Sequence, residues 1–225
     1  MNARNRRHRT SGFSLIEMTM VVALGITVSV FSVMSLVPAM NSQHVTNAYN
    51  TTLSALRQAR DCSVSQRTSY SVTFSNTVSP NTVTIAATTA FPGDTCSLTY
   101  SLPLDVTFQT NSTISSTTAP DTSAGASFGT GANAIDFGYT ANSSSGGQTV
   151  VYFCPDGSAQ TVACTSGVYS TAGGYSSNWD NGVVYMARGT DVLSSRAVSL
   201  WGGTGRIHGW RLYAKSGGGY QWVRQ

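Results

Sequence analysis

The stretch that decides the fold is FSLIEMTMVVALGITVSVFSVMSLVPAM, residues 13–40, in which Glu17 is the only charged residue. The next charged residue along the chain is Arg57. An α-helix rises about 1.5 Å per residue, so this stretch reaches roughly 42 Å and can cross a hydrocarbon core of about 30 Å. The sequence therefore predicts a transmembrane helix over about residues 13–40.

The basic residues that precede this stretch predict its orientation. Positive charges beside a membrane helix favour the cytoplasmic side, so the N-terminus is expected inside and the remaining chain outside. The four arginines concerned are Arg4, Arg6, Arg7 and Arg9.

The net charge of +4 and the pI near 9.0 are not spread over the chain. Residues 61–187 carry seven acids and one base, Arg67, whereas residues 188–225 carry six bases and one acid, Asp191. Removal of the leader would leave nine bases against nine acids. The basic character is local to the tail, so the net charge alone does not indicate a nucleic-acid-binding protein.

A conventional secretory signal has its small-residue cleavage site after the apolar run. Here Gly12 precedes the run, and Glu17 lies inside it. An ionised carboxylate near a membrane core costs at least a few kcal/mol unless it is paired, so Glu17 is a candidate functional residue whose expected partner is a positive charge.

The segment Ser11-Gly12-Phe13-Ser14-Leu15-Ile16-Glu17-Met18 resembles the type III signal of type IV prepilins and pseudopilins. The resemblance implies that residues 1–12 are a leader cut after Gly12 by a prepilin peptidase, which also methylates Phe13. Glu17 of one subunit would then neutralise the α-amino group of Phe13 on a neighbour, which removes two desolvation penalties together. The alternative is an ordinary signal anchor with an incidental glutamate.

This resemblance also implies a location and partners. The chain would be a single-pass protein of the bacterial inner membrane with its head outside, and later a subunit of a periplasmic or cell-surface filament. Its partners would be the peptidase and other pilin or pseudopilin subunits, which it would contact through the N-terminal helix.

Helical spacing continues beyond the apolar stretch and predicts one helix over residues 13–67. The segment has no proline or glycine between Asn41 and Arg67. Its second part, Leu53-Ser54-Ala55-Leu56-Arg57-Gln58-Ala59-Arg60, is similar to the helix of FimT-like and GspH-like minor pilins and pseudopilins. The apolar or small positions expected on its buried face are Val45, Tyr49, Leu53, Leu56, Ala59 and Val64.

After residue 67 the apolar period changes to two, which predicts strands. Turn signals such as Pro155-Asp156-Gly157 separate them. The expected fold is α+β, with the helix packed against an antiparallel head of two sheets over residues 68–225. A Ser/Thr/Gly-rich stretch at 110–149 is expected to be a surface loop. Expected strands lie near 70–74, 83–85, 96–100, 135–137, 150–154, 183–187, 197–201, 206–213 and 220–223.

The chain has four cysteines, which allow three pairings. An oxidising compartment outside the cytoplasm makes disulfides more favourable than free thiols. The pairings we favour join Cys154 to Cys164 around the turn at 155–157, and Cys62 to Cys96 between helix and sheet. Neither the spacing nor a nearby histidine supports a zinc site.

The sequence offers no set of residues for catalysis and no cofactor motif, so the chain is not expected to be an enzyme. Three classes of function are compatible with the sequence. The first is a structural minor subunit of a pilus or a type II secretion pseudopilus. The others are a DNA-capturing subunit of a competence pilus and an unrelated enzyme with a membrane anchor. The structural subunit explains Glu17 and the long helix without a further assumption.

The DNA-capturing alternative depends on the tail GRIHGWRLYAK, residues 205–215. It resembles the glycine–arginine-rich tail of some FimT-like pilins, although His208 stands where a second arginine is expected. Arg206, His208 and Arg211 would share one strand edge if Gly209 distorts the strand, and Lys215 would add a fourth base. The competing interpretation is that the arginines solvate the rim or pair with acids of the head.

Overall fold

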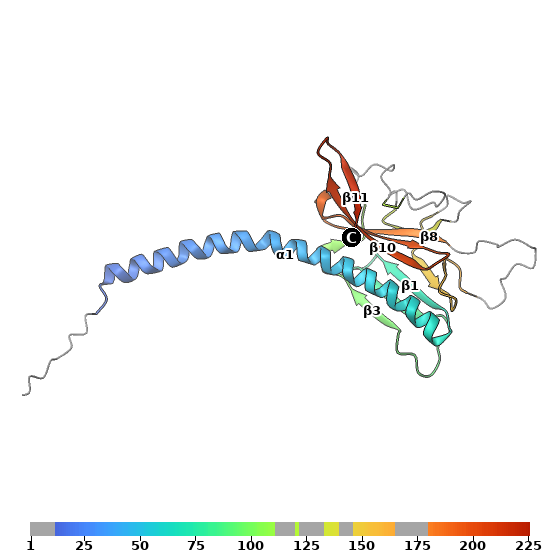
Figure 1. Ribbon diagram of the computed structural model, residues 1–225. Helices are drawn as coiled ribbons and strands as arrows, with labels where there is room; N and C mark the ends of the chain where they lie inside the picture. Colours follow the sequence, from blue (N-terminus) through green and yellow to red (C-terminus); the bar gives the residue numbers. More distant parts are fainter. Residues whose placement is uncertain (1–11, 111–119, 122–132, 140–145, 165–179) are drawn as a thin grey trace, which may run out of the picture. The chain divides into compact units, whose positions relative to one another are not determined.

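The computed structural model describes residues 12–110, 120–121, 133–139, 146–164 and 180–225 (Figure 1). A single α-helix, α1 (Leu15–Gln66), precedes the strands. The chain divides into two units, Met1–Asn41 and Ser42–Gln225. The remaining elements are β1 (Tyr70–Ser75), β2 (Thr82–Ala87), β3 (Leu98–Ser101), β4 (Val106–Thr107), β5 (Ile135–Tyr139), β6 (Val150–Phe153), β7 (Ala159–Gln160), β8 (Asn181–Arg188), the 3-10 turn η2 (Val192–Ser194), β9 (Arg196–Trp201), β10 (Arg206–Ala214) and β11 (Tyr220–Arg224).

The first unit contains the apolar half of α1. Its segment Leu15–Ser32 has a mean hydropathy of 1.9, and none of its residues is buried. It is long and apolar enough to cross a membrane, because 18 helical residues span about 27 Å. A helix that is apolar on all sides needs an apolar environment from outside the chain.

The second unit is built on the other half of α1, whose inner face lies in the core of the head. The predicted helical spacing is confirmed as far as Ala59, but Val64 is 47% exposed. Cys62 and Ser63 take the next inward positions, because a period of 3.6 residues leads from Ala59 to them. The helix residues buried in this core are Val45, Ala48, Tyr49, Leu53, Ala55, Leu56, Ala59 and Cys62.

Two antiparallel sheets complete the head, as the sequence predicts. One has the strand order β3-β2-β1-β6-β7, and the other β11-β10-β9-β8-β4 with β5 also paired to β8. Their inner faces share one apolar cluster with α1, and the rings of Phe74 on β1 and Phe137 on β5 stack 5.4 Å apart. Strands β4 and β7 were not predicted, because two residues are too few to show an alternating pattern.

Both favoured disulfides are present. Cys62 on α1 is bonded to Cys96 just before β3, and Cys154 is bonded to Cys164. The first bond joins the end of the helix to the five-stranded sheet, and the second closes the turn that leads into β7.

The strand expected near residues 135–137 is confirmed as β5, and it interrupts the stretch at 110–149 for which a surface loop was expected. Ile135, Phe137 and Tyr139 are buried, and Asp136 between them is fully buried as well. The carboxylate of Asp136 accepts hydrogen bonds from the Tyr139 hydroxyl and the Gly147 amide, which compensate for its burial. Residues 111–119, 122–132 and 140–145 lie outside the described residues.

A glycine permits the close contact between α1 and β10. A Cβ atom placed on Gly209 would lie 1.6 Å from the hydroxyl oxygen of Tyr49. No side chain fits in that space, so the aromatic ring of Tyr49 lies directly on the strand. The sequence prediction that Gly209 distorts β10 is wrong: the ladder with β9 continues without a shift from Arg206 to Arg211.

Replacement of Gly209 by alanine is therefore expected to lower the free energy of unfolding by about 1–3 kcal/mol, because the core must expand to admit a methyl group. Gly217→Ala is the matched control, since a Cβ there meets nothing within 4 Å. Urea unfolding of the full chain in detergent, followed by tryptophan fluorescence, measures both variants. Equal stability of the two would contradict the close contact.

Candidate functional site

The first candidate site is the start of the apolar helix. A Cβ atom placed on Gly12 would meet no other atom within 4 Å, and Phe13 is 75% exposed. Glu17 lies in the first turn of α1, where the helix dipole favours a negative charge. No ion pair to Glu17 is present among the described residues of the chain, so its carboxylate is available to a group from outside. Of the predicted leader, only Gly12 is described.

The second candidate is the basic tail, and the regular geometry of β10 divides its residues between two faces. Alternation along a strand places Arg206 and His208 on one face and Arg211 on the other. Gly209 and Arg211 share the face toward α1, because Gly209 contacts Tyr49. The expectation that Arg206, His208 and Arg211 share one edge is therefore wrong.

His208 is not available as a surface base. Its Nδ1 lies 3.2 Å from a carboxylate oxygen of Asp121, and its side chain is 13% exposed. The same carboxylate accepts a hydrogen bond from the indole Nε1 of Trp201 at 2.9 Å. His208 is therefore held by an acid of the head and is not presented at the surface.

Arg211 lies directly opposite Arg196 in the ladder between β9 and β10. Arg196 is buried, and its Nη1 donates to the carbonyl oxygens of Leu193, Ser194 and Ser195. Burial lowers the pKa of Arg196, and the charge of Arg211 lowers it further. Like charges at directly opposed positions destabilise a sheet.

The remaining contacts of Arg211 are also internal to the head. Its guanidinium lies over the ring of Tyr213, 5.1 Å from the ring centroid, and its Nε is buried without a hydrogen-bond partner. Lys215 is exposed at the turn after β10, where its backbone amide donates to Gly219. Of the four tail residues, only Arg206 and Lys215 are exposed.

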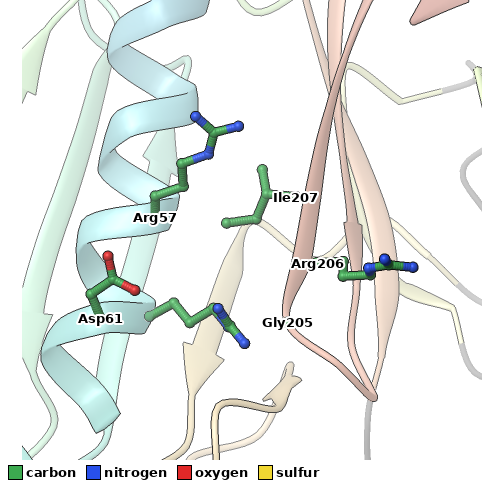
Figure 2. A pocket seen from close by; sticks show the side chains of 6 residues that line it. Arg57, Asp61, Gly205, Arg206 and Ile207 are labelled. Carbon is green, nitrogen blue, oxygen red and sulfur yellow. The ribbon is translucent and has the colours of Figure 1, made fainter. Parts of the chain in front are cut away.

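A hollow of about 230 Å³ lies where the start of β10 meets α1 (Figure 2). Arg206 contributes to its wall, but its guanidinium points away from the helix. Arg57 extends from α1 toward β10, close to Ile207. The lining residues are Arg57, Arg60, Asp61, Gly205, Arg206 and Ile207.

Arg60 crosses from α1 to the two turns beyond this hollow. Its Nη2 donates to the carbonyl oxygen of Thr204 at 3.2 Å, and its Nε donates to that of Gly157 at 3.4 Å. A Cβ on Gly205 would lie 2.6 Å from the Nε of Arg60 and 2.1 Å from the Gly157 oxygen. The glycine of the predicted glycine–arginine motif therefore makes room for the helix arginine.

An ionic cluster that the sequence analysis missed holds α1 to the opposite end of the six-stranded sheet. The Nδ1 of His44 lies 2.9 Å from one carboxylate oxygen of Asp105, and the Nε of Arg188 donates to the other at 2.7 Å. These residues are 61 and 83 positions apart from Asp105, so no local pattern could have paired them. Burial tends to raise the pKa of Asp105, but the hydrogen bonds from His44 and Arg188 outweigh it and the net pKa is lowered.

A carboxylate with a lowered folded-state pKa stabilises the fold above its unfolded pKa, near 3.9, and loses this effect as the pH falls through the folded value. The stability of the full chain is thus expected to fall below about pH 4. Asp105→Asn is expected to cost about 1 kcal/mol at pH 7 and to reduce this acid dependence. Asp61→Asn serves as the control, because Asp61 is exposed and has no hydrogen bond or ion pair among the described residues. Urea unfolding at pH 7 and pH 3 measures the effect, and identical pH profiles for wild type and Asp105→Asn would contradict it.

Comparison of the chain with protein-family models, with curated proteins and with solved structures finds no match.

Proposed function

We propose that the chain is a membrane-anchored filament subunit with an extracytoplasmic head. More particularly, it is a minor pilin or pseudopilin that serves in the assembly of a type IV pilus or a type II secretion pseudopilus. The observation that carries this proposal is the unequal use of one helix. One face of the half after Ser42 is buried in the core of the head. The half before it exposes apolar side chains. That half carries a single acid, Glu17, which is the fifth residue counted from Phe13.

This division of α1 supports two successive environments for its first half. In the membrane, the apolar segment is solvated by lipid, and Glu17 near its end lies close to the interface. In the filament, the same segment packs against the helices of other subunits, where the carboxylate of Glu17 meets the amine of Phe13 on a neighbour. The pair replaces the water that each charge loses, so neither is left buried alone.

The proposal includes its processing partner and its location. A prepilin peptidase cuts after Gly12 on the cytoplasmic side of the inner membrane and methylates Phe13. The subunit then passes into a periplasmic or cell-surface filament. The exposure of Gly12 and Phe13 supports this step, because a protease requires an accessible segment.

DNA capture stays a separate prediction, and the positions of the basic residues of the tail do not support it. The two exposed bases, Arg206 and Lys215, lie at opposite ends of β10, and His208 and Arg211 are held by contacts inside the head.

Protein from its native membrane is expected to begin at Phe13 and to carry one added methyl group. Intact mass spectrometry measures this directly, and a Gly12→Val variant, which the peptidase cannot process, should keep the mass of the full precursor. A mature terminus at Met1, or one beyond the apolar stretch, would contradict the processing step.

Glu17→Ala is expected to leave membrane insertion and head folding unchanged and to reduce the amount of the chain in filaments at least about tenfold, since it leaves the neighbour's amine unpaired in an apolar setting. Sheared filaments and membranes are compared by immunoblot. Thr19→Ala is a matched control two residues away, because the Thr19 hydroxyl only donates to the carbonyl of Ile16 in its own helix. Normal incorporation of Glu17→Ala would mean that charge pairing is not used by this subunit.

A further inference from the structure

The hollow between α1 and β10 contains an arginine without a counter-charge. Arg57 is exposed, and among the described residues no hydrogen bond or ion pair to its guanidinium is present. Asp61 lies one helical turn away, yet it forms no ion pair with Arg57. Figure 2 shows the Arg57 side chain directed toward β10 rather than toward Asp61.

The second arginine of the hollow, Arg60, is fixed in place. Its bonds to Gly157 and Thr204 use two of the five guanidinium N–H groups, which leaves three. The glycine at position 205 is required for this placement. Fixing a cation in this way lowers the entropy that it loses when a ligand binds.

Charge and size together define the class of ligand. Three arginines and one carboxylate line the hollow, but the guanidinium of Arg206 points away, so Arg57, Arg60 and Asp61 leave a surplus of one positive charge. Its volume of about 230 Å³ is below the roughly 300–1,000 Å³ of sites for small-molecule ligands. A single carboxylate matches the surplus of one positive charge and the small volume. A nucleic-acid strand would bring several negative charges close to the carboxylate of Asp61. It would not meet the guanidinium of Arg206, which points away from the hollow.

We propose that this hollow binds the side-chain carboxylate of an aspartate or glutamate from a neighbouring filament subunit. Arg57 forms the bidentate pair with it, and Arg60 adds a second, fixed positive charge to the wall of the same hollow. The inference rests on the proposed function, because packing of the apolar helices would bring the heads of adjacent subunits alongside one another. It adds a specific contact between heads to the pairing of Glu17 within the helices.

The test uses the full chain in detergent with ¹⁵N-labelled arginine side chains. The probe is glutamic acid capped at both ends, N-acetyl-glutamate amide, and the matched control probe is N-acetyl-glutamine amide. The Nε–H signals of Arg57 and Arg60 are expected to shift in a saturable manner with the first probe and not with the second. Arg57→Gln should weaken binding about tenfold, the loss expected for one charge-assisted pair. Arg224→Gln, at an exposed arginine of β11 outside the hollow, should leave binding unchanged.

Inorganic phosphate and a short single-stranded DNA are titrated in parallel. Absence of a saturable shift with capped glutamate would overturn the site. Tighter binding of phosphate or DNA through the same two arginines would overturn its assignment to a carboxylate.

Filament incorporation separates this inference from the function on which it rests. Arg57→Gln is expected to reduce incorporation several-fold while Arg224→Gln does not. A wild-type chain that binds capped glutamate but never enters filaments would contradict the filament proposal and, with it, the assignment of the ligand to a neighbouring subunit. A chain that enters filaments equally well with Arg57→Gln would contradict the head contact alone.

Discussion

Two glycines of the segment around β10 let α1 approach the six-stranded sheet closely, and the packing of the head depends on this approach. Gly209 makes room for the ring of Tyr49, and Gly205 makes room for the side chain of Arg60. Between these points the helix contributes Leu53 and Leu56 to the shared core. Because the two sheets and the helix meet in one apolar cluster, a change in the height of α1 above β10 would disturb the contacts of both sheets.

The same approach explains how the basic residues of the tail are used. A strand directs alternate side chains to opposite faces, so neighbouring bases in the sequence meet different surroundings. His208 meets the buried Asp121, and Arg211 meets Arg196 and Tyr213. Desolvation makes an unpaired cation costly, which is why the buried guanidinium of Arg196 is tied to three backbone carbonyls. Arg57 and Arg206, whose guanidiniums have no such partners among the described residues, lie at the surface.

The first half of α1 obeys a different constraint. Its segment Leu15–Ser32 is apolar, and none of these residues is buried by the described part of the chain. A single acid in such a segment has no ion pair among the described residues, and the proposed function supplies one on a neighbouring helix. One continuous helix thus combines an exposed apolar segment with a segment that packs in the core of the head.

The sequence by itself determined the elements whose signal lies within a few neighbouring residues. The apolar stretch at 13–40, the helical spacing to Ala59 and the alternating strands β1 and β2 follow from backbone periods that a single segment displays. Both disulfides were among the pairings that the cysteine count allows. The glycine–arginine tail was recognised as a motif, but the prediction for Gly209 was wrong, because the contact that requires a glycine there lies on another element.

Only the tertiary structure decided which side chains meet. It placed Arg60 against Gly205, about 145 positions away, paired His44 with Asp105, and gave the fully buried Asp136 its hydrogen-bond partners. Such contacts depend on the register of the ladders and the height of the helix above the sheet. Both are set by packing over the whole core, and a local pattern carries no information about them.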